Sequence, residues 1–207
     1  MAKATLRRSK GVETTFLPAA VERVSERRQE VLEAAANVFR RKGFRDSSMR
    51  EIAEVAGIRG GSMYHHFTSK EALFLEIHGV ALTSAAIQVE AAIAGLTDPW
   101  ARLEAACARH LELQVDPASL TLPLMNDLPH TDSDLHAKLV VQRDEFELVY
   151  RRLVEELPLP ESFDRKIYRI TLLTLMNNVP SWYRPGLATP AEIAHQIVHI
   201  YRHPTAD

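Results

Sequence analysis

Apolar residues recur along the chain every three to four positions, which is the period of an amphipathic α-helix. The first such pattern begins near Glu22 and ends at Gly43, a residue suited to the left-handed backbone that terminates helices. Its apolar stripe consists of Val31, Ala35, Val38 and Phe39. The pattern therefore predicts one amphipathic helix followed by a sharp stop.

Two short helices separated by a turn are predicted next. The first covers 49–56, begins after the capping residue Ser48 and carries apolar residues on one face. Gly57 breaks it, and the second runs from about Gly61 to His66. Helices this short are not stable alone, so we expect both to pack on the preceding helix, with Ile58 filling the small core between them.

The rest of the chain also predicts helices. Ser69 caps a helix long enough to bridge two domains, and Thr189 with Glu192 forms a capping box before the last one. The other predicted helices cover 98–115, 117–127, 133–157 and 167–179. The 167–179 segment is apolar nearly all round, so it is either buried or shared with a second subunit, and Pro180 should kink or end it. With no strand pattern, the fold class is all-α with about nine helices.

Composition agrees with a globular protein. The 207 residues are 46% hydrophobic and 25% charged, and no run of about 20 apolar residues suggests a membrane span. The N-terminal residues are basic but are not followed by the apolar segment of a secretory signal. We therefore expect a cytoplasmic protein with no membrane partner.

Charge is divided unevenly, although the whole chain carries only −2. Residues 1–70 contain 14 Lys and Arg against 8 Asp and Glu, giving +6, whereas the remainder carries −8. This places positive potential where a polyanion would bind. Residues 1–20 lack helical periodicity and are interpreted as a flexible basic arm.

The segment SSMREIAEVAGIRGGSMYHHFTSKEALF resembles the signature of TetR-family repressors. In that family a short helix, a turn, a recognition helix ending in Y-x-x-F and a helix beginning with SKE occur together. The resemblance implies a three-helix, helix-turn-helix DNA-binding domain over 21–68 and a ligand-binding and dimerisation domain over 69–207. It also implies a homodimer that binds palindromic double-stranded operator DNA and is released by a small-molecule inducer, with no cofactor.

The resemblance assigns DNA contacts to residues around the two short helices: Ser47, Ser48, Arg50, Arg59, Gly60, Gly61, Ser62, Tyr64, His65 and Lys70. Arg50 can pair with a guanine edge or a phosphate, and serines at a helix start favour an anion, although N-capping alone also explains them. Met63 and Phe67 should face the core instead. Relatives often have Ser or Thr where Arg59 stands, so capping here is weaker, and the two glycines leave more of the specificity to Arg59, Arg50 and DNA shape.

The family's C-terminal helices dimerise through a four-helix bundle and enclose an apolar pocket. Candidates for the dimer face are the 167–179 helix and the last helix with Ile193, Ile197 and Ile200. The ligand-lining candidates are Leu113, Met125, Phe146, Tyr150, Met176 and Asn177, for which ordinary core packing is the alternative. The segment SWYRPG, with Trp182 and Arg184, resembles a TetR subgroup that includes acyl-CoA-responsive regulators, but these aromatics also suit a sealed helix end. The inducer is thus expected to be an acyl-CoA or another lipid-like metabolite. The alternative is that the protein regulates an efflux system and responds to a drug-like apolar compound.

Other chemistry is not indicated. The single cysteine, Cys107, has no disulfide partner and is interpreted as a packing residue. His195, His199 and His203 share a helix face, but no cysteine or carboxylate cluster accompanies them, so no metal site is predicted. Hydrolase, metalloprotease and phosphate-loop motifs are absent from the sequence, which argues against an enzyme.

Overall fold

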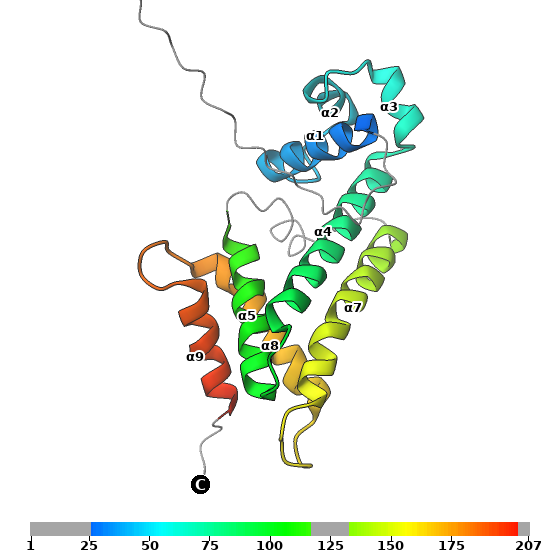
Figure 1. The fold of residues 1–207 in the computed structure, drawn as a ribbon. Coiled ribbons are helices and arrows are strands. Elements are labelled where there is room, and N and C mark those ends of the chain that lie inside the picture. Colours follow the sequence, from blue (N-terminus) through cyan, green and yellow to red (C-terminus); the bar gives the residue numbers. More distant parts are fainter. Residues whose placement is uncertain (1–25, 117–132, 203–207) are drawn as a thin grey trace, which may run out of the picture.

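The computed structural model describes residues 26–116 and 133–202. Within these ranges the chain forms eight helices and no strand, in agreement with the all-α prediction (Figure 1). Their bounds are α1 (Glu26–Lys42), α2 (Met49–Val55), α3 (Gly60–His66), α4 (Lys70–Ile93), α5 (Pro99–Val115), α7 (Ser133–Glu155), α8 (Arg165–Trp182) and α9 (Pro190–Arg202). The predicted basic arm, the predicted helix 117–127, Met125 and His203 lie outside the described residues.

Three of the predicted helix starts carry the expected caps. Ser48 Oγ accepts a hydrogen bond from Glu51 N, and Ser69 Oγ accepts one from Ala72 N. At α9, Thr189 Oγ1 accepts from Glu192 N while the Glu192 carboxylate accepts from Thr189 N at 2.7 Å, which is the reciprocal capping box that the sequence predicts. These side chains satisfy backbone donors that the first turn of a helix leaves unpaired.

Of the two outcomes predicted at Pro180, a kink or an end of the helix, the end is wrong. Pro180 lies inside the helix, which continues to Trp182 and is closed by a hydrogen bond from Tyr183 N to Val179 O. A proline inside a helix removes its own N–H bond and its ring crowds the carbonyl of the preceding turn, but a helix can continue past it when its neighbours are held by packing. Val179 is fully buried in the C-terminal core and supplies that packing.

Helix α4 runs from the N-terminal helices into the C-terminal ones (Figure 1) and takes part in two separate hydrophobic cores. Its first half contributes Leu73, Phe74 and Ile77 to the core of α1 to α3, and its second half contributes Leu82, Ala85, Val89 and Ile93 to the core of the C-terminal helices. Although α4 is long and apolar enough by composition to cross a membrane, with a mean hydropathy of 1.5 over an 18-residue stretch, this division of its apolar residues between two cores identifies it as a core helix.

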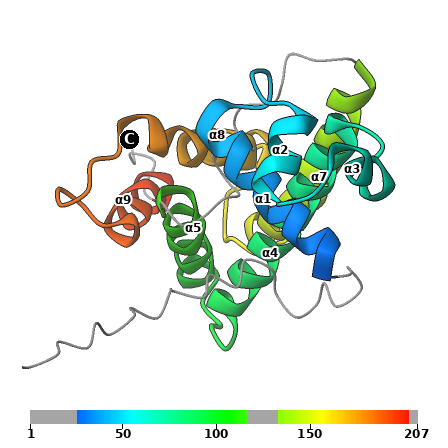
Figure 2. The same cartoon turned by 90° about the horizontal axis from the view of Figure 1, so that it is seen from above.

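Helix α7 also joins both parts of the molecule. Leu135 and Leu139, in its first turns, belong to the core of the N-terminal helices, whereas Phe146 and Tyr150 belong to the C-terminal core. The view from above shows α1 to α3 seated over the end of α4 and α7 (Figure 2). The small N-terminal domain is therefore held by two long helices that run into the C-terminal domain.

Candidate nucleic-acid interface and ligand domain

The turn between α2 and α3 has the geometry of a helix-turn-helix. Gly57 adopts φ +64°, a left-handed conformation that costs other residues free energy. Ile58, which follows it, is partly buried against the N-terminal core, and its N–H donates to Ala53 O at 2.9 Å. The turn thus fixes the angle at which α3 leaves α2.

Helix α3 buries one side and exposes the other. Met63 is fully buried and Phe67 is nearly so, which agrees with their predicted role in the core. Tyr64 is 60% exposed, and His65 is exposed beside it. Because the buried pair already anchors the helix, the opposite face is available for a partner.

The two glycines at the start of α3 have no structural role that requires glycine. Neither Gly60 nor Gly61 has a positive φ, and a Cβ at either position would meet no atom within 4 Å. Glycine in a helix costs up to about 1 kcal/mol relative to alanine. Arg59 precedes them as N-cap without a side-chain cap bond, as predicted, so this helix start is weak within the protomer.

Arg50 and Arg59 are exposed on the same small domain. Among the described residues Arg50 pairs only with Glu54 on its own helix, at 3.3 Å between Nε and Oε1, an exposed contact of small energy. Ser48 is exposed and Ser62 is half-buried. A polyanion can therefore recruit the Arg50 side chain at little cost.

Ser47 and Lys70 make structural contacts within the chain. Ser47 is buried, and its hydroxyl donates to Phe44 O at 2.6 Å. Lys70 Nζ donates to Phe44 O at 2.7 Å, to Ser47 O at 2.8 Å and to Arg45 O at 3.3 Å, and it lies over the Phe44 ring. A phosphate contact by Lys70 would thus compete with three bonds that hold the loop between α1 and α2.

An ion pair joins helix α1 of the DNA-binding domain to the long helix α4. The Arg28 guanidinium on α1 binds both oxygens of the Glu76 carboxylate on α4 and also lies over the Phe67 ring, 4.4 Å from its centroid. A bidentate pair of this kind is more directional than a single ion pair. A shift of α4 would therefore be transmitted to α1 and α3.

In the C-terminal domain, four predicted ligand-lining residues lie together. Leu113, Phe146, Tyr150 and Met176 all belong to its buried core. Trp182 is half-exposed and Arg184 is exposed at and beyond the end of α8, so both lie apart from that core. The structure brings together the residues predicted on α5, α7 and α8 but not those of the SWYRPG segment.

A buried chain of polar groups crosses this core, and the sequence analysis missed it. Gln114 Nε2 donates to Asn177 Oδ1 at 2.8 Å and to His110 Nε2 at 2.7 Å. His110 therefore carries its proton on Nδ1, which donates to the Tyr150 hydroxyl at 2.8 Å, and that hydroxyl donates to Ala106 O. Burial lowers the pKa of His110 to about 4, opposed by a hydrogen bond with Asn177. Gln114 Oε1 is buried and has no hydrogen-bond partner among the described residues.

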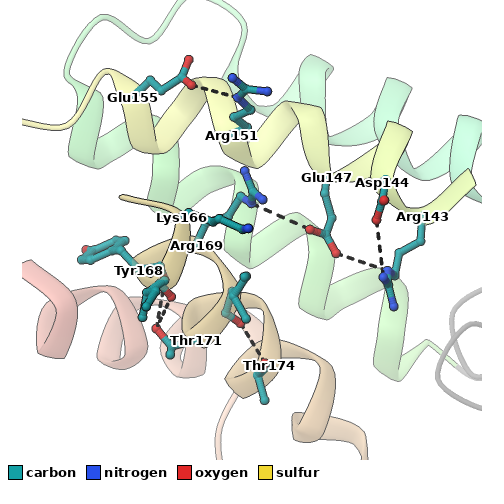
Figure 3. A network of polar contacts seen from close by, with 12 residues as sticks. Arg143, Asp144, Glu147, Arg151, Glu155, Lys166, Tyr168, Arg169, Thr171 and Thr174 are labelled. Carbon is teal, nitrogen blue, oxygen red and sulfur yellow. Dashed lines mark hydrogen bonds and ion pairs between the residues drawn. The ribbon is translucent and has the colours of Figure 1, made fainter. Parts of the chain in front are cut away.

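A charged cleft of about 510 Å³ opens between α7 and α8. Its walls carry four cationic and two acidic side chains, Arg143, Arg151, Lys166, Arg169, Asp144 and Glu147. In Figure 3 the ion pair between Glu147 on α7 and Arg169 on α8 joins the two helices, whereas Arg143 contacts Asp144 and Glu147 on its own helix. Burial raises the pKa of the Glu147 carboxyl, and the nearby Arg143 and Arg169 oppose this shift. Asn177 also lines the cleft, and its hydrogen bond with Gln114 links the cleft to the buried polar chain. Sequence patterns on single helices do not reveal such a cleft.

The cysteine and the two described histidines of α9 make contacts within the protein. Cys107 is fully buried, and burial raises the pKa of its thiol, which suits the predicted packing role. His195 Nδ1 contacts Glu104 Oε1 at 3.0 Å, and the His195 and His199 rings are stacked. Among residues 26–116 and 133–202, no group of three or more potential ligands is placed to hold a metal ion.

The apolar faces of α8 and α9 are partly uncovered. Ile167 and Ile200 are 60% and 65% exposed, and Leu175 is 47% exposed. A groove of about 600 Å³ between the two helices is lined by these residues and by Tyr168 and Tyr201. Of the three isoleucines predicted on α9, only Ile200 points outward, because Ile193 and Ile197 pack in the protomer's own core.

Several curated proteins match a short part of this chain, 24% to 27% of its length and 26% to 28% of theirs. One is the HTH-type transcriptional repressor KstR2 of Rhodococcus jostii (strain RHA1), which is 51% identical over 53 residues, or 26% of this chain and 26% of the relative. The chain thus matches only about a quarter of the length of the curated relatives.

Solved structures align over most of the chain. AibR in complex with isovaleryl coenzyme A and operator DNA is 20% identical, with a TM-score of 0.72 over 84% of this chain and 97% of that one. FadR from Bacillus subtilis in complex with stearoyl-CoA is 16% identical, with a TM-score of 0.74 over 83% and 96%. At these identities the likeness shows the fold.

Two family models match the sequence. Residues 31–77 match "Bacterial regulatory proteins, tetR family", and residues 96–204 match "Tetracyclin repressor-like, C-terminal domain". The second match alone spans more than half of the chain and the first covers the helix-turn-helix. The chain therefore belongs to the TetR family of bacterial transcriptional regulators.

Proposed function

We propose that this protein is a cytoplasmic transcription repressor that binds palindromic operator DNA as a homodimer and is released by an acyl-CoA or similar lipid-like effector. The observation that carries the DNA-binding part is the exposed face of α3, where Gly60, Gly61, Tyr64 and His65 have no packing role while Met63 and Phe67 anchor the helix. An α-helix held in this way suits the major groove, into which close approach is easiest where side chains are absent.

The proposed DNA contacts divide into two classes. Arg50 and Arg59 are the candidates for reading base edges, and Tyr64, His65, Ser48 and Ser62 for phosphates, with Gly60 and Gly61 permitting close approach. Lys70 and Ser47 support this surface indirectly, since their polar atoms hold the loop before α2. Base contacts supply selectivity, whereas phosphate contacts supply affinity and its dependence on salt.

Dimerisation is proposed through α8 and α9. The uncovered side chains of Ile167, Leu175 and Ile200 form an apolar surface of the kind that a second copy covers. Two-fold pairing of this surface would present two α3 helices to one palindromic site, with their spacing set by the C-terminal domains.

The effector part rests on the C-terminal domain and on the relatives. Gln114 presents a buried acceptor without a partner among the described residues, which is unusual in a packed core and suits a ligand that brings a donor. The similar structures of AibR and of B. subtilis FadR were solved with acyl-CoA molecules. The effector would act by binding the conformation that does not fit DNA more tightly than the one that does.

Operator binding by an Arg50→Ala, Tyr64→Phe double variant tests the DNA-binding surface. We expect fluorescence anisotropy with the protein's own upstream intergenic DNA to show affinity reduced by about 1–3 kcal/mol, the usual value of a lost base contact. Arg151→Ala, assayed without effector, is the matched control, because Arg151 is also exposed and pairs with Glu155 four residues on, as Arg50 pairs with Glu54. Unchanged affinity in the double variant would contradict the proposal and favour a helical interaction module.

A further inference from the structure

The cleft between α7 and α8 contains more positive than negative charge. Arg143 and Arg151 on α7 and Lys166 and Arg169 on α8 face it, against Asp144 and Glu147 (Figure 3). The lining side chains therefore sum to a charge of +2. The apolar residues Leu148, Ile170 and Leu173 also line the cleft and lower the local polarity, which strengthens the field of the cations.

Glu147 only partly neutralises the two arginines beside it. Its carboxylate lies 3.5 Å from Arg143 Nε and 3.8 Å from Arg169 Nε, and neither nitrogen has a hydrogen-bond partner among the described residues although both atoms are buried. Buried N–H groups are normally paired. Two guanidinium groups thus present donors that an additional anionic oxygen would satisfy.

Two further cations at the cleft are readily available to a ligand. Within the described part of the chain, no ion pair is formed by the Lys166 ammonium, which is exposed. Arg151 contacts Glu155 on its own helix at 2.9 Å, an exposed pair of small energy. Both side chains can therefore turn to a bound anion without breaking a strong contact.

We propose that this cleft binds the phosphate groups of an organic phosphate effector. Arg143, Arg151, Lys166 and Arg169 would supply the charge, and Asn177, which lines the cleft and is bonded to Gln114, would direct the rest of the ligand toward Gln114 and the domain core. This inference rests on the proposed function, which assumes that an effector exists. It adds where the effector binds and which of its chemical groups is recognised. Arginine pairs suit phosphate because their planar forks bind two oxygens at once.

Helix α7 connects this cleft to the DNA-binding domain. Arg143 follows Gln142, whose side chain is bonded to His78 and to Leu75 O on α4, and Leu139 and Leu135 continue into the core of α1 to α3. An anion that draws α7 toward α8 would therefore act on both helices that carry the helix-turn-helix. The cleft is placed to transmit its occupancy to the DNA-binding surface.

Isothermal titration of the full chain without DNA tests the cleft. The probes are coenzyme A, adenosine 3′,5′-bisphosphate and inorganic phosphate, each at low and high salt. The test variant is Arg151→Gln with Lys166→Gln, and the matched control is Lys138→Gln with Arg152→Gln, which removes two exposed cations of α7 outside the cleft. Thermal melting of both variants checks that the fold is kept.

We expect coenzyme A to bind the wild type and the control alike, and the cleft variant about tenfold more weakly, with salt reducing affinity in the first two. Similar binding of the bisphosphate would assign recognition to the nucleotide end, and binding of inorganic phosphate alone would identify a free-phosphate source. If coenzyme A bound the cleft variant as tightly as the wild type, the proposal that the cleft binds phosphate would be wrong, but the proposal of an acyl-CoA effector would stand. If none of the three probes bound, the proposed phosphate site would be wrong. The DNA-binding part of the proposed function is tested separately, by operator binding.

Discussion

Gln142 of α7 is hydrogen-bonded to His78 of α4, with 2.7 Å between Gln142 Oε1 and His78 Nδ1. The Gln142 amide nitrogen also donates to Leu75 O, so the oxygen is the acceptor and His78 carries its proton on Nδ1. Gly79 lies against the same side chain, since a Cβ there would be 2.7 Å from Gln142 Nε2. This contact joins the two helices that connect the domains.

Replacing Gln142 by leucine should leave the His78 donor buried without a partner. We expect the free energy of unfolding, measured in urea, to fall by about 1–3 kcal/mol. Effector-induced loss of operator affinity should also shrink, because α7 would follow the cleft without carrying α4. In a double-mutant cycle with His78→Phe, the two changes should be less than additive, and full additivity would show that the pair does not interact.

Gly60→Ala with Gly61→Ala should separate stability from DNA binding. Both positions are open and have ordinary helical backbone, so the substitutions should stabilise the protein by about 1 kcal/mol in total. Operator affinity should nevertheless fall about tenfold, since the added methyl groups would obstruct close approach to the groove. Thr83→Ala, on an exposed position of α4, controls for improved helix propensity. Retained operator affinity in the double variant would show that α3 does not approach DNA at these glycines.

The sequence predicts the local geometry of the helix-turn-helix but not the contacts between distant helices. The turn, the caps and the inward direction of Met63 and Phe67 follow from spacing and capping chemistry within 40 residues, and the structure confirms them. The cleft was not predictable, because Arg143 and Arg169 meet only through the packing of α7 on α8. His110 and Gln114 likewise read as isolated polar residues on an apolar helix until Tyr150 and Asn177 are placed beside them.

The buried imidazole of His110 should make the protein less stable in acid. Burial lowers its pKa from 6.5 to about 4 in the folded state, so the unfolded chain binds a proton more readily between these values. The free energy of unfolding should therefore decrease by about 3 kcal/mol as pH falls through this window, with no further contribution below it. Burial lowers the pKa of His78 too, which acts in the same direction. Reversible urea unfolding from pH 7.5 to pH 4 measures the effect.

The His110→Asn variant should lose this share of the pH dependence, even if it is less stable at neutral pH. His136→Asn, at an exposed position of α7, controls for removal of a histidine as such. A wild-type and a His110→Asn protein with parallel pH profiles would contradict the assignment of a neutral buried imidazole.

Leu175→Glu should prevent dimerisation with little effect on the fold of the protomer. Leu175 is 47% exposed on the apolar groove between α8 and α9, so a carboxylate there is tolerated in the monomer but not in a covered interface. We expect analytical ultracentrifugation to show a monomer and operator affinity to fall sharply, because only one half-site would be bound. Val141→Glu makes the same kind of change on α7, away from this groove. A dimer that survives Leu175→Glu would place the interface elsewhere.

The most direct test of the central claim is binding of the wild-type protein to its upstream intergenic DNA, followed by fluorescence anisotropy with and without acyl-CoA thioesters of several chain lengths. The proposed function predicts salt-sensitive binding that prefers this DNA to a scrambled sequence and is released by at least one thioester. Release by a drug-like apolar compound instead would favour the efflux regulator. Binding that does not distinguish the operator from scrambled DNA would contradict the proposal that α3 reads an operator.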